Sequence, residues 1–253
     1  MKRRLLIDGD IYCYQQALAA QTIFNFGDGD EDVTVVNEEA AIANLDAAFH
    51  SLLKTLSAED VIVCITHPEN FRKKLLSSYK ENRAAKEKPK LLDALRKHVM
   101  DNWKGFCKPG IEADDSLGIL STRGSEVYQL IIVSGDKDLE TIPGWLYNPR
   151  KDTKPRKITE EEADYKFFSQ ALTGDATDGY KGCPGIGKVK AAVILDPYLG
   201  SPLIDLWNLI VETYEAKGLT EQDALTQARM ARILRVIDYD FKNDEVILWT
   251  PPI

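Results

Sequence analysis

The chain has 253 residues, 44% of them hydrophobic, and a formal net charge of -8 at pH 7. This length allows one large domain, or two closely packed ones, around a substantial core. Apolar runs stay below the ~20 residues of a membrane span, and Asp8 interrupts the first run too early for a signal peptide. We therefore expect a cytoplasmic protein without a membrane partner.

The cysteines and histidines argue against a zinc site. Four cysteines are scattered without a C-x-x-C pair, and the chain has only three histidines. Such spacing indicates neither a zinc cage nor a disulfide framework. Any metal ion in this protein would therefore be held by oxygen ligands.

Apolar segments of strand length alternate with segments of helix length in the first part of the chain. The predicted strands lie at 3–7, 60–65, 129–134 and 145–147. Because these segments are apolar almost throughout, they predict an α/β fold with a central, mostly parallel sheet covered by helices on both faces. The chain beyond about residue 158 is predicted to be helical, with a short strand in DEVILW at 244–249.

Charge is distributed very unevenly along the chain. Residues 70–108 hold twelve Lys or Arg and four acidic residues, a local charge of +8, so the rest of the chain sums to -16. A second basic stretch, RKDTKPRK at 150–157, contains a proline and lacks apolar periodicity, which predicts a loop. A charge run is usually a solvated surface, but two basic stretches in an acidic chain favour contact with phosphate.

Acidic residues gather near the ends of predicted strands. Asp8 follows the first strand and Asp136 the third, and ligands bind at this carboxyl edge in open parallel sheets. IEADD at 111–115 begins a helix, where acids alone could simply favour the helix dipole. GDATDG at 174–179 adds two carboxylates in a glycine-flanked turn. The complete set of candidate metal ligands is Asp8, Glu112, Asp114, Asp115, Asp136, Asp138, Asp175 and Asp178.

Carboxylates placed this close together repel one another unless cations lie among them. Hard divalent ions, Mg²⁺ or Mn²⁺, suit an all-oxygen set, and we expect two of them. Two such ions beside a basic segment are typical of phosphodiester hydrolysis, in which one ion generates hydroxide and both contact the attacking and leaving oxygens. Lysines and arginines would position the phosphate.

The segment at 182–188 reads GCPGIGK. This pattern is typical of a tight turn between two helices, in which Gly182, Gly185 and Gly187 permit the turn and backbone N–H groups face a phosphate. Alone, a glycine-proline turn is usually only a turn. Its place just after the acidic GDATD motif makes the pattern more specific.

The ordered motifs LLIDGD, FRKKLLSSYKENR, IEADD, VSGDKDLETI and GDATDGYKGCPGIG resemble those of the 5′-nucleases, a family of flap endonucleases and 5′→3′ exonucleases. The closing QARMARILRVIDYDFKNDEVILWTPP is most similar to the exonucleases of small short-tailed lytic phages. This resemblance implies a nuclease core at 1–160 with a basic helical arch at about 68–108. It also implies a helical region at 161–253 with a DNA-binding helix-hairpin-helix motif at 174–195.

The resemblance further implies roles for individual residues. The first metal ion would be held by Asp8, Glu112 and Asp114, and the second by Asp136, Asp138 and Asp178, with Asp115 and Asp175 assisting. Lys80 and Arg83 would be the active-site cations. The DNA contacts would be Tyr79, Arg72, Lys73, Lys86, Lys181, Gly182, Gly185, Gly187, Lys188 and Lys190. A K⁺ ion would accompany the hairpin at 182–188.

The activity that the resemblance implies is Mg²⁺-dependent 5′→3′ hydrolysis of duplex DNA, with flap cleavage and removal of RNA primers, in phage replication or recombination. Its partners would be duplex DNA with a 5′ end or flap and RNA–DNA hybrid, and the protein would be a monomer. The residues also allow a phosphatase of the haloacid-dehalogenase type, with Asp8 as nucleophile and Asp10 as general acid, or a non-catalytic DNA-binding module.

Several positions leave alternatives open. Many relatives carry an acid after the second strand, where this chain has His67, so we expect a water or Glu69 to complete the coordination. Asp10 is either a ligand or a turn cap. The aromatic pair Tyr12 and Tyr14 fits the core and a helix surface, or base stacking. Asp28, Asp30, Asp32 and Glu39 match calcium-loop positions, but Val33 replaces the required glycine, so a polar hairpin turn is predicted there.

Overall fold

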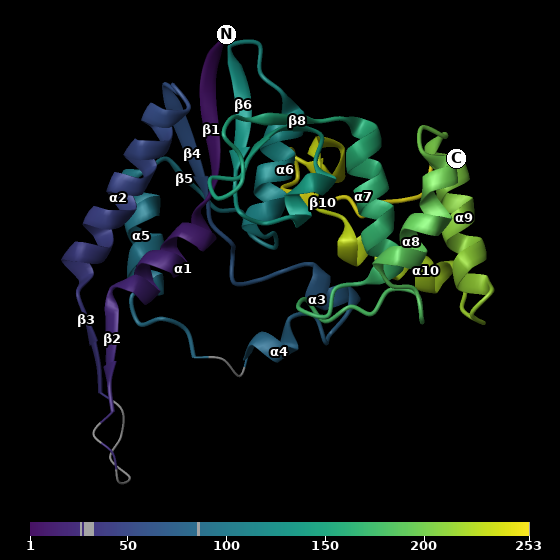
Figure 1. The fold of residues 1–253 in the computed structure, drawn as a ribbon, viewed down its shortest axis with the longest axis horizontal. Coiled ribbons are helices and arrows are strands. Elements are labelled where there is room, and N and C mark those ends of the chain that lie inside the picture. The colour runs from purple at the N-terminus through teal and green to yellow at the C-terminus, as the bar shows by residue number, and fades with distance from the viewer. Residues whose placement is uncertain (26, 28–32, 85–86, 253) are drawn as a thin grey trace.

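The computed structural model describes residues 1–25, 27, 33–84 and 87–252, and Figure 1 shows their arrangement. Lys86 and the possible calcium-loop residues Asp28, Asp30 and Asp32 therefore lie outside the described residues, as does the side chain of Arg83. No helix in the described ranges is long and apolar enough to cross a membrane.

The core of the fold is a six-stranded sheet in the order β5–β4–β1–β6–β7–β8. Its strands are β1 (Lys2–Asp8), β4 (Asp60–Cys64), β5 (Gly105–Phe106), β6 (Tyr128–Val133), β7 (Gly144–Tyr147) and β8 (Arg156–Ile158). All neighbours pair in parallel except β7 and β8, which are antiparallel. The predicted mostly parallel sheet is thus confirmed, and the two strands that the sequence did not reveal have only two and three residues.

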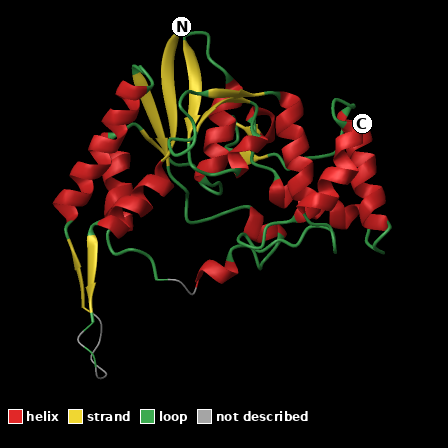
Figure 2. Ribbon diagram, viewed as in Figure 1, coloured by secondary structure: helices red, strands yellow, loops and turns green. Residues whose placement is uncertain are grey.

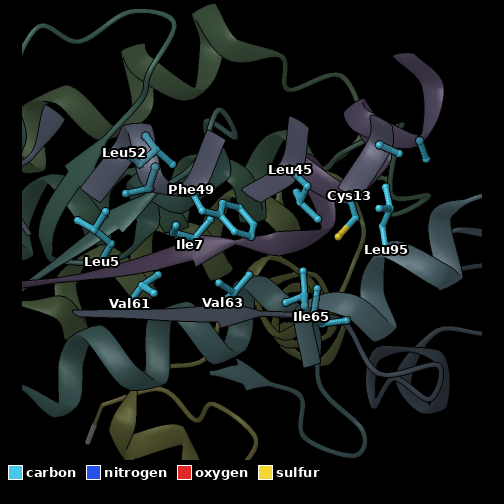
Figure 3. Close-up of a cluster of buried hydrophobic side chains, with 14 of the residues drawn as sticks. Leu5, Ile7, Cys13, Leu45, Phe49, Leu52, Val61, Val63, Ile65 and Leu95 are labelled. Carbon is cyan, nitrogen blue, oxygen red and sulfur yellow. The ribbon is translucent and has the colours of Figure 1, made fainter. Parts of the chain in front are cut away.

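Helices cover both faces of this sheet, as predicted (Figure 2). One face packs against α1 (Gly9–Ala19), α2 (Glu38–Thr55) and α5 (Leu92–Asn102), and the other packs against α6 (Ala113–Arg123). Leu5 and Ile7 point into the first cluster, shown in Figure 3, whereas Leu6 points into the second. This alternation follows from the two-residue period of a strand, and it explains why β1 is apolar at every central position.

A separate hairpin of β2 (Gln21–Phe24) and β3 (Val33–Val36) projects away from the body of the molecule (Figure 1). Its strands pair antiparallel and form a two-stranded sheet of their own. A hairpin agrees with the prediction made for this region, although the turn itself lies among the residues left undescribed.

The basic segment between β4 and α5 contains two short helices, α3 (Arg72–Leu75) and α4 (Glu81–Ala84). Both lie beyond the carboxyl ends of the strands in Figure 1. Asn82 donates hydrogen bonds to the carbonyl oxygens of Ala176 and Thr177 at 3.2 and 3.3 Å, so α4 lies beside the GDATDG turn. The basic segment therefore joins the sheet edge to the C-terminal region.

The C-terminal region is mainly helical, as predicted. Its helices are α7 (Glu160–Thr173), α8 (Lys188–Leu195), α9 (Leu203–Glu215) and α10 (Glu221–Ala231). Thr159 and Thr220 cap α7 and α10, in each case with the acid three residues later completing a capping box. These helices share a core of their own, in which Phe168 and Trp207 pack against Trp249.

The remaining elements are short. They are the 3₁₀ turns η1 (Asp138–Thr141), η2 (Asp196–Tyr198) and η3 (Val236–Asp238), and the paired strands β9 (Tyr239–Asp240) and β10 (Glu245–Val246). The strand predicted around 244–249 is β10, which has only two residues. Leu234 and Tyr239 pack against Phe71 and Ile111, so the end of the chain contacts both the basic segment and the start of α6.

Candidate active site

The first carboxylate at the sheet edge is Asp8, which ends β1 and caps α1. The backbone N–H of Ile11 donates to its Oδ1 at 3.3 Å, and the Ser134 hydroxyl donates to its Oδ2 at 2.8 Å. Asp8 is only 3% exposed. Burial raises the pKa of Asp8 to about 7, with further contributions from the charges of Asp10 and Asp136.

Glu112 lies at the start of α6, where the arrangement of neighbouring groups favours its ionised form. It pairs with the ammonium of Lys80, accepts a hydrogen bond from the Tyr79 hydroxyl at 2.7 Å and lies 3.3 Å from Nη1 of Arg72. Burial by itself raises the pKa of Glu112, but the charges of Arg72 and Lys80 outweigh burial and lower it to about 2.

Asp114, two residues into the same helix start, experiences the opposite balance. Burial raises its pKa well above the ordinary value, and the charges of Asp8, Asp136 and Glu112 raise it further. The charges of three other carboxylates thus act on Asp114, and we call Asp8, Glu112, Asp114 and Asp136 the first carboxylate group.

A second carboxylate group consists of Asp136, Asp138, Asp175 and Asp178. Burial raises the pKa of Asp138 to about 6, and the charges of the other three also raise it. Lys137 lies 3.7 Å from Asp138 and 3.9 Å from Asp175. Asp136 belongs to both groups, because it also raises the pKa of Asp8 and Asp114.

The GDATDG turn presents the last two of these acids. Oδ1 of Asp175 accepts the N–H groups of Thr177 at 2.7 Å and of Asp178 at 3.2 Å, and its own N–H donates to the carbonyl oxygen of Tyr180 at 2.9 Å. Gly174, with φ +65°, packs so tightly against the backbone of Lys181 and Gly182 that a Cβ would lie 2.3 Å from it. The turn therefore requires glycine at this position.

Lys80 lies between the two carboxylate groups. Its Nζ pairs with Glu112 and lies 3.6 Å from Oδ2 of Asp178, and its backbone N–H donates to the carbonyl oxygen of Asp178 at 2.9 Å. Its φ of +55° is in the left-handed region, which is costly for a residue with a side chain. The surrounding contacts thus hold this lysine in a strained backbone position.

The carboxylates do not form a complete coordination shell as they stand. Within the part of the chain that the structure describes, no three His, Cys, Asp or Glu side chains are close enough together to share a metal ion. The donor chemistry nevertheless fits a hard divalent cation, since all the candidate ligands are oxygens. Burial, together with the charges of neighbouring carboxylates, raises the pKa of Asp8, Asp114 and Asp138, and a bound cation would oppose both effects.

Arg72, predicted as a DNA contact, is 3% exposed and does not fit that role. It forms a two-point ion pair with Asp115, with both N–O distances at 2.7 Å, and its other N–H groups donate to backbone carbonyls of Met230 and Arg232. With every donor occupied inside the protein, this guanidinium is not available to a phosphate. These distant partners could not have been inferred from the basic FRKK motif.

Asp115, predicted to assist metal binding, has no exposed surface. Besides Arg72, its carboxylate accepts the N–H of Glu112 at 3.0 Å and the N–H of Leu234 at 3.1 Å. These contacts fix the start of α6, so Asp115 orients Glu112 and Asp114 through the backbone. In this structure both of its oxygens accept hydrogen bonds from protein donors, and it shares Nη1 of Arg72 with Glu112.

Two further predicted DNA contacts are buried. Tyr79 is 3% exposed, and its hydroxyl lies 2.7 Å from Glu112 and 3.1 Å from Asp178. Gly182 is buried too, and its N–H donates to the side chain of Gln227 at 2.8 Å. Both residues therefore support the site from within, because neither offers its polar groups to the surface.

The other predicted DNA contacts in the described ranges lie at the surface. They are Lys73, Lys181, Gly185, Gly187, Lys188 and Lys190. A Cβ at Gly185 or Gly187 would meet no atom within 4 Å, so the backbone there is open to a partner. Nζ of Lys190 donates to the carbonyl oxygen of Gly185 at 2.9 Å, which places this cation at the turn.

The sequence left the roles of Asp10 and His67 open, and in the structure both side chains have hydrogen-bond partners. Asp10 pairs with Arg96 at 2.8 Å and accepts the N–H of Thr66 at 3.1 Å, so it links α1 to α5 and to the segment after β4, while the cap of α1 is Asp8. Nδ1 of His67 accepts the N–H of Glu69 at 3.1 Å. In the neutral ring this contact places the proton on Nε2, which cannot then act as a metal ligand.

Sequence reasoning missed two residues that contact the carboxylate groups. Ser134, at the end of β6, joins Asp8 to Asp136, whose N–H donates to the serine oxygen at 3.0 Å. Nε2 of Gln170, on α7, donates to Oδ1 of Asp138 at 2.7 Å. The position of Ser134 just before Asp136 was a usable signal, whereas nothing local in the sequence marks Gln170.

Comparison with known proteins gives a consistent result. The family model of the 5′-3′ exonuclease N-terminal, resolvase-like domain matches residues 3–163. An exodeoxyribonuclease of Enterobacteria phage T3 is 30% identical over 225 residues, which cover 76% of this chain and 73% of that protein. An exonuclease of Escherichia phage T7 is 29% identical over 242 residues, which cover 81% and 78% of the two chains.

Among solved structures, the T5 5′-exonuclease with bound zinc ions has a similar fold. It superposes with a TM-score of 0.66 at 17% identity and covers 91% of this chain and 89% of that chain. At this identity the likeness supports the fold, including the central sheet flanked by helices.

Proposed function

Because the chain belongs to the 5′-3′ exonuclease family, we propose that it is a divalent-metal-dependent nuclease that hydrolyses phosphodiester bonds at 5′ ends of duplex DNA. The observation that carries this proposal is the pair of carboxylate groups, joined by Asp136 and adjoining Lys80, at the carboxyl edge of the sheet. Flap cleavage and removal of RNA primers from RNA–DNA hybrid belong to the same proposal, as does a role in phage replication or recombination.

The carboxylates are assigned to two Mg²⁺ or Mn²⁺ ions. Asp8, Glu112 and Asp114 would hold the first, and Asp136, Asp138 and Asp178 the second. When bound, such ions polarise the phosphate and supply a nucleophile at neutral pH. Asp115 and Asp175 would assist from the protein side, since both fix the backbone on which the neighbouring acids are placed.

Lys80 and Arg83 would act on the phosphate itself. The Lys80 ammonium is held between the two carboxylate groups, where a positive charge opposes the negative charge that develops on phosphate oxygens. Arg83 follows three residues later on α4, and its side chain is assigned the same task from the family motif alone.

Nucleic acid would be held by the exposed cations around this edge. Lys73 on α3 and Lys181, Lys188 and Lys190 near the glycine turn are exposed, and Lys86 is assigned with them from the sequence. N–H groups at a turn that precedes a helix suit phosphate, and a K⁺ ion at residues 182–188 would bridge the turn to the nucleic-acid backbone. The phage T5 flap endonuclease has been crystallised in complex with DNA and metal ions, which supports this partner.

The basic stretch at 150–157, a loop that runs into the start of β8 at Arg156, is a further phosphate contact in this proposal. Lys151 and Lys154 are exposed, and the loop follows β7 at the same carboxyl edge. Asn148 anchors it, since its N–H donates to Asp152 at 2.7 Å and its side chain accepts the N–H of Arg150 at 3.0 Å. The protein is proposed to act as a monomer in the cytoplasm of the host cell.

The test is to incubate the purified protein with a duplex carrying separate labels at its 5′ and 3′ ends, in Mg²⁺, in Mn²⁺ and in EDTA. We expect the 5′ label to be released first, only with metal, and p-nitrophenyl phosphate to remain intact. Hydrolysis of the phosphomonoester alone would instead indicate the phosphatase alternative. Duplex binding without any cleavage would indicate a binding module.

A further inference from the structure

We propose that Ser134 is a positioning residue that holds the two carboxylate groups in a fixed relation to one another. The inference rests on the proposed function, and it assigns a role that the acidic motifs do not contain. The Ser134 hydroxyl lies at the end of β6, between Asp8 and Asp136.

The Ser134 hydroxyl uses both of its hydrogen-bonding capacities within the site. It donates to Oδ2 of Asp8 at 2.8 Å and accepts the backbone N–H of Asp136 at 3.0 Å. The residue is 1% exposed, so bulk water does not compete for either bond. Asp8 belongs to the first carboxylate group and Asp136 to both, and therefore this hydroxyl links the groups directly.

Hydrogen bonds continue from Ser134 into the second group. Oδ1 of Asp136 accepts the N–H of Asp138 at 2.8 Å, and Oδ1 of Asp138 accepts Nε2 of Gln170 at 2.7 Å. The series therefore runs from β1 through the end of β6 to α7. Ser134 makes the hydrogen bond that connects the end of β6 to the end of β1 in this series.

This arrangement fixes how Asp8 presents its carboxylate. With Oδ2 bonded to Ser134 and Oδ1 to the N–H of Ile11, rotation of the side chain would break at least one bond. Groups that hold a ligand's orientation in this way generally contribute 10–100-fold to metal affinity, roughly, without touching the metal. Removal of the hydroxyl would leave Asp8 held only by the N–H of Ile11 and would remove the hydrogen-bond acceptor of the N–H of Asp136.

The chain contains a matched control for this change. Ser116, on α6, is also fully buried, with 0% exposure, but its hydroxyl has no hydrogen-bond partner in the described structure. Ser116→Ala and Ser134→Ala therefore remove the same atom from equally buried positions. They differ in whether that atom contacts the carboxylates.

The experiment is a calorimetric titration of Mn²⁺ into the metal-free full-length protein, without nucleic acid, for the wild type and both serine variants. We expect Ser134→Ala to weaken Mn²⁺ binding by about tenfold, while Ser116→Ala stays within about twofold of the wild type. Ser134→Cys, which keeps nearly the same volume but donates poorly, should resemble Ser134→Ala. Thermal melts check that each variant is folded at the titration temperature.

Cleavage of the 5′-labelled duplex against Mg²⁺ concentration provides the second readout. We expect Ser134→Ala to need about ten times more Mg²⁺ for half-maximal rate, with binding to duplex in EDTA unchanged. If the wild type cleaves but Ser134→Ala and Ser116→Ala bind Mn²⁺ alike, the inference about Ser134 is wrong and the proposed function stands. If the wild type neither binds Mn²⁺ nor cleaves, both are wrong.

Discussion

The two carboxylate groups carry similar charge but are compensated in different ways. In the first group, Glu112 is 7% exposed. It accepts hydrogen bonds from Arg72, Tyr79 and Lys80, which all belong to the basic segment. In the second group, Lys137, with a side chain 57% exposed, lies 3.7 Å from Asp138 and 3.9 Å from Asp175, and Lys80 lies 3.6 Å from Asp178. Glu112 is thus stabilised by the buried guanidinium of Arg72 and by Lys80, whereas Asp138 and Asp175 pair at longer distances with the exposed Lys137.

This difference suggests why the basic segment contributes to more than phosphate binding. Arg72 and Tyr79 are buried, and they maintain the charge and orientation of Glu112. The exposed members of the same segment, such as Lys73, remain available to nucleic acid. In the proposed function, one stretch of sequence therefore contributes both to the metal site and to the nucleic-acid surface.

The largest expected effect comes from removing an acid that the two groups need. Asp8→Asn and Asp136→Asn should each lower the hydrolysis rate by about 10³-fold, because a group that organises transition-state charge is lost. Duplex binding should stay within a few fold, since the proposed phosphate contacts lie elsewhere. Asp205→Asn, at an exposed acid on α9, is the control. A near-normal rate in either site variant would refute the metal assignment.

Lys80→Ala should have the next largest effect. It removes the cation that lies between the two carboxylate groups. We expect the rate constant for cleavage to fall by about 10²-fold and affinity for duplex to change little, because this charge faces the reacting phosphate. Lys73→Ala, at an exposed cation of the same segment, should show the reverse pattern. Single-turnover kinetics separate the two quantities, and a loss of affinity alone in Lys80→Ala would place Lys80 among the outer contacts.

The pH dependence of stability should distinguish two acids of the first group, Asp8 and Glu112, without any substrate. Burial raises the pKa of Asp8 from 3.8 to about 7, so the folded protein retains a proton that the unfolded chain has lost. The resulting stability is fully present below 3.8 and is lost as pH rises through 7. Glu112 behaves oppositely: its contribution is present above 4.5 and is lost as pH falls toward 2.

Metal-free wild-type protein should therefore be more stable near pH 5.5 than near pH 8. The Asp8→Asn variant, which cannot titrate there, should reduce that difference by on the order of 2 kcal/mol. Urea unfolding in EDTA at the two pH values measures it. An identical difference in both proteins would show that Asp8 is ionised without penalty in the metal-free fold.

The salt dependence of duplex binding should show whether the exposed cations contact phosphate, despite the acidic net charge of -8. Binding to duplex should weaken steeply with salt, and Lys181→Ala or Lys188→Ala should each reduce the slope of log K against log salt by about 1. Lys217→Ala, beyond α9, is the control. A flat salt response in the wild type would argue against phosphate contacts by these lysines.

His67 should give the smallest effect. Because its Nδ1 accepts the N–H of Glu69, the ring is not prepared to bind metal, and imidazole is a poorer Mg²⁺ ligand than carboxylate. We expect His67→Ala to retain cleavage within about fivefold of the wild type, far above Asp8→Asn. Equal losses in the two variants would instead make His67 a required ligand or base.

The sequence predicted the parts of this structure that depend on local pattern. The four main strands were visible because parallel strands are apolar throughout, and Asp8 and Asp136 could be placed at one edge because such strands end together. The strands β5 and β8 are too short to show a period. The helices of the basic segment are also only four residues each.

Burial explains most of what the sequence could not predict at the site. Arg72 and Lys73 are neighbouring basic residues that the sequence pattern does not distinguish. Arg72 is buried against Asp115 and the segment after α10, whereas Lys73 is exposed. Contacts between residues 43 and 160 positions apart make that difference. The partners of Ser134 and Gln170 are likewise set by how strands and helices meet.

The most direct test of the central claim, that two joined carboxylate groups bind the metal ions for cleavage, is the stoichiometry of Mn²⁺ binding. Calorimetry with the protein bound to an uncleavable 5′-phosphorothioate duplex measures it. We predict two ions per wild-type chain, loss of one in Glu112→Gln and weakening of both in Asp136→Asn. Binding of no ion, or an unchanged stoichiometry and affinity in Asp136→Asn, would contradict the account.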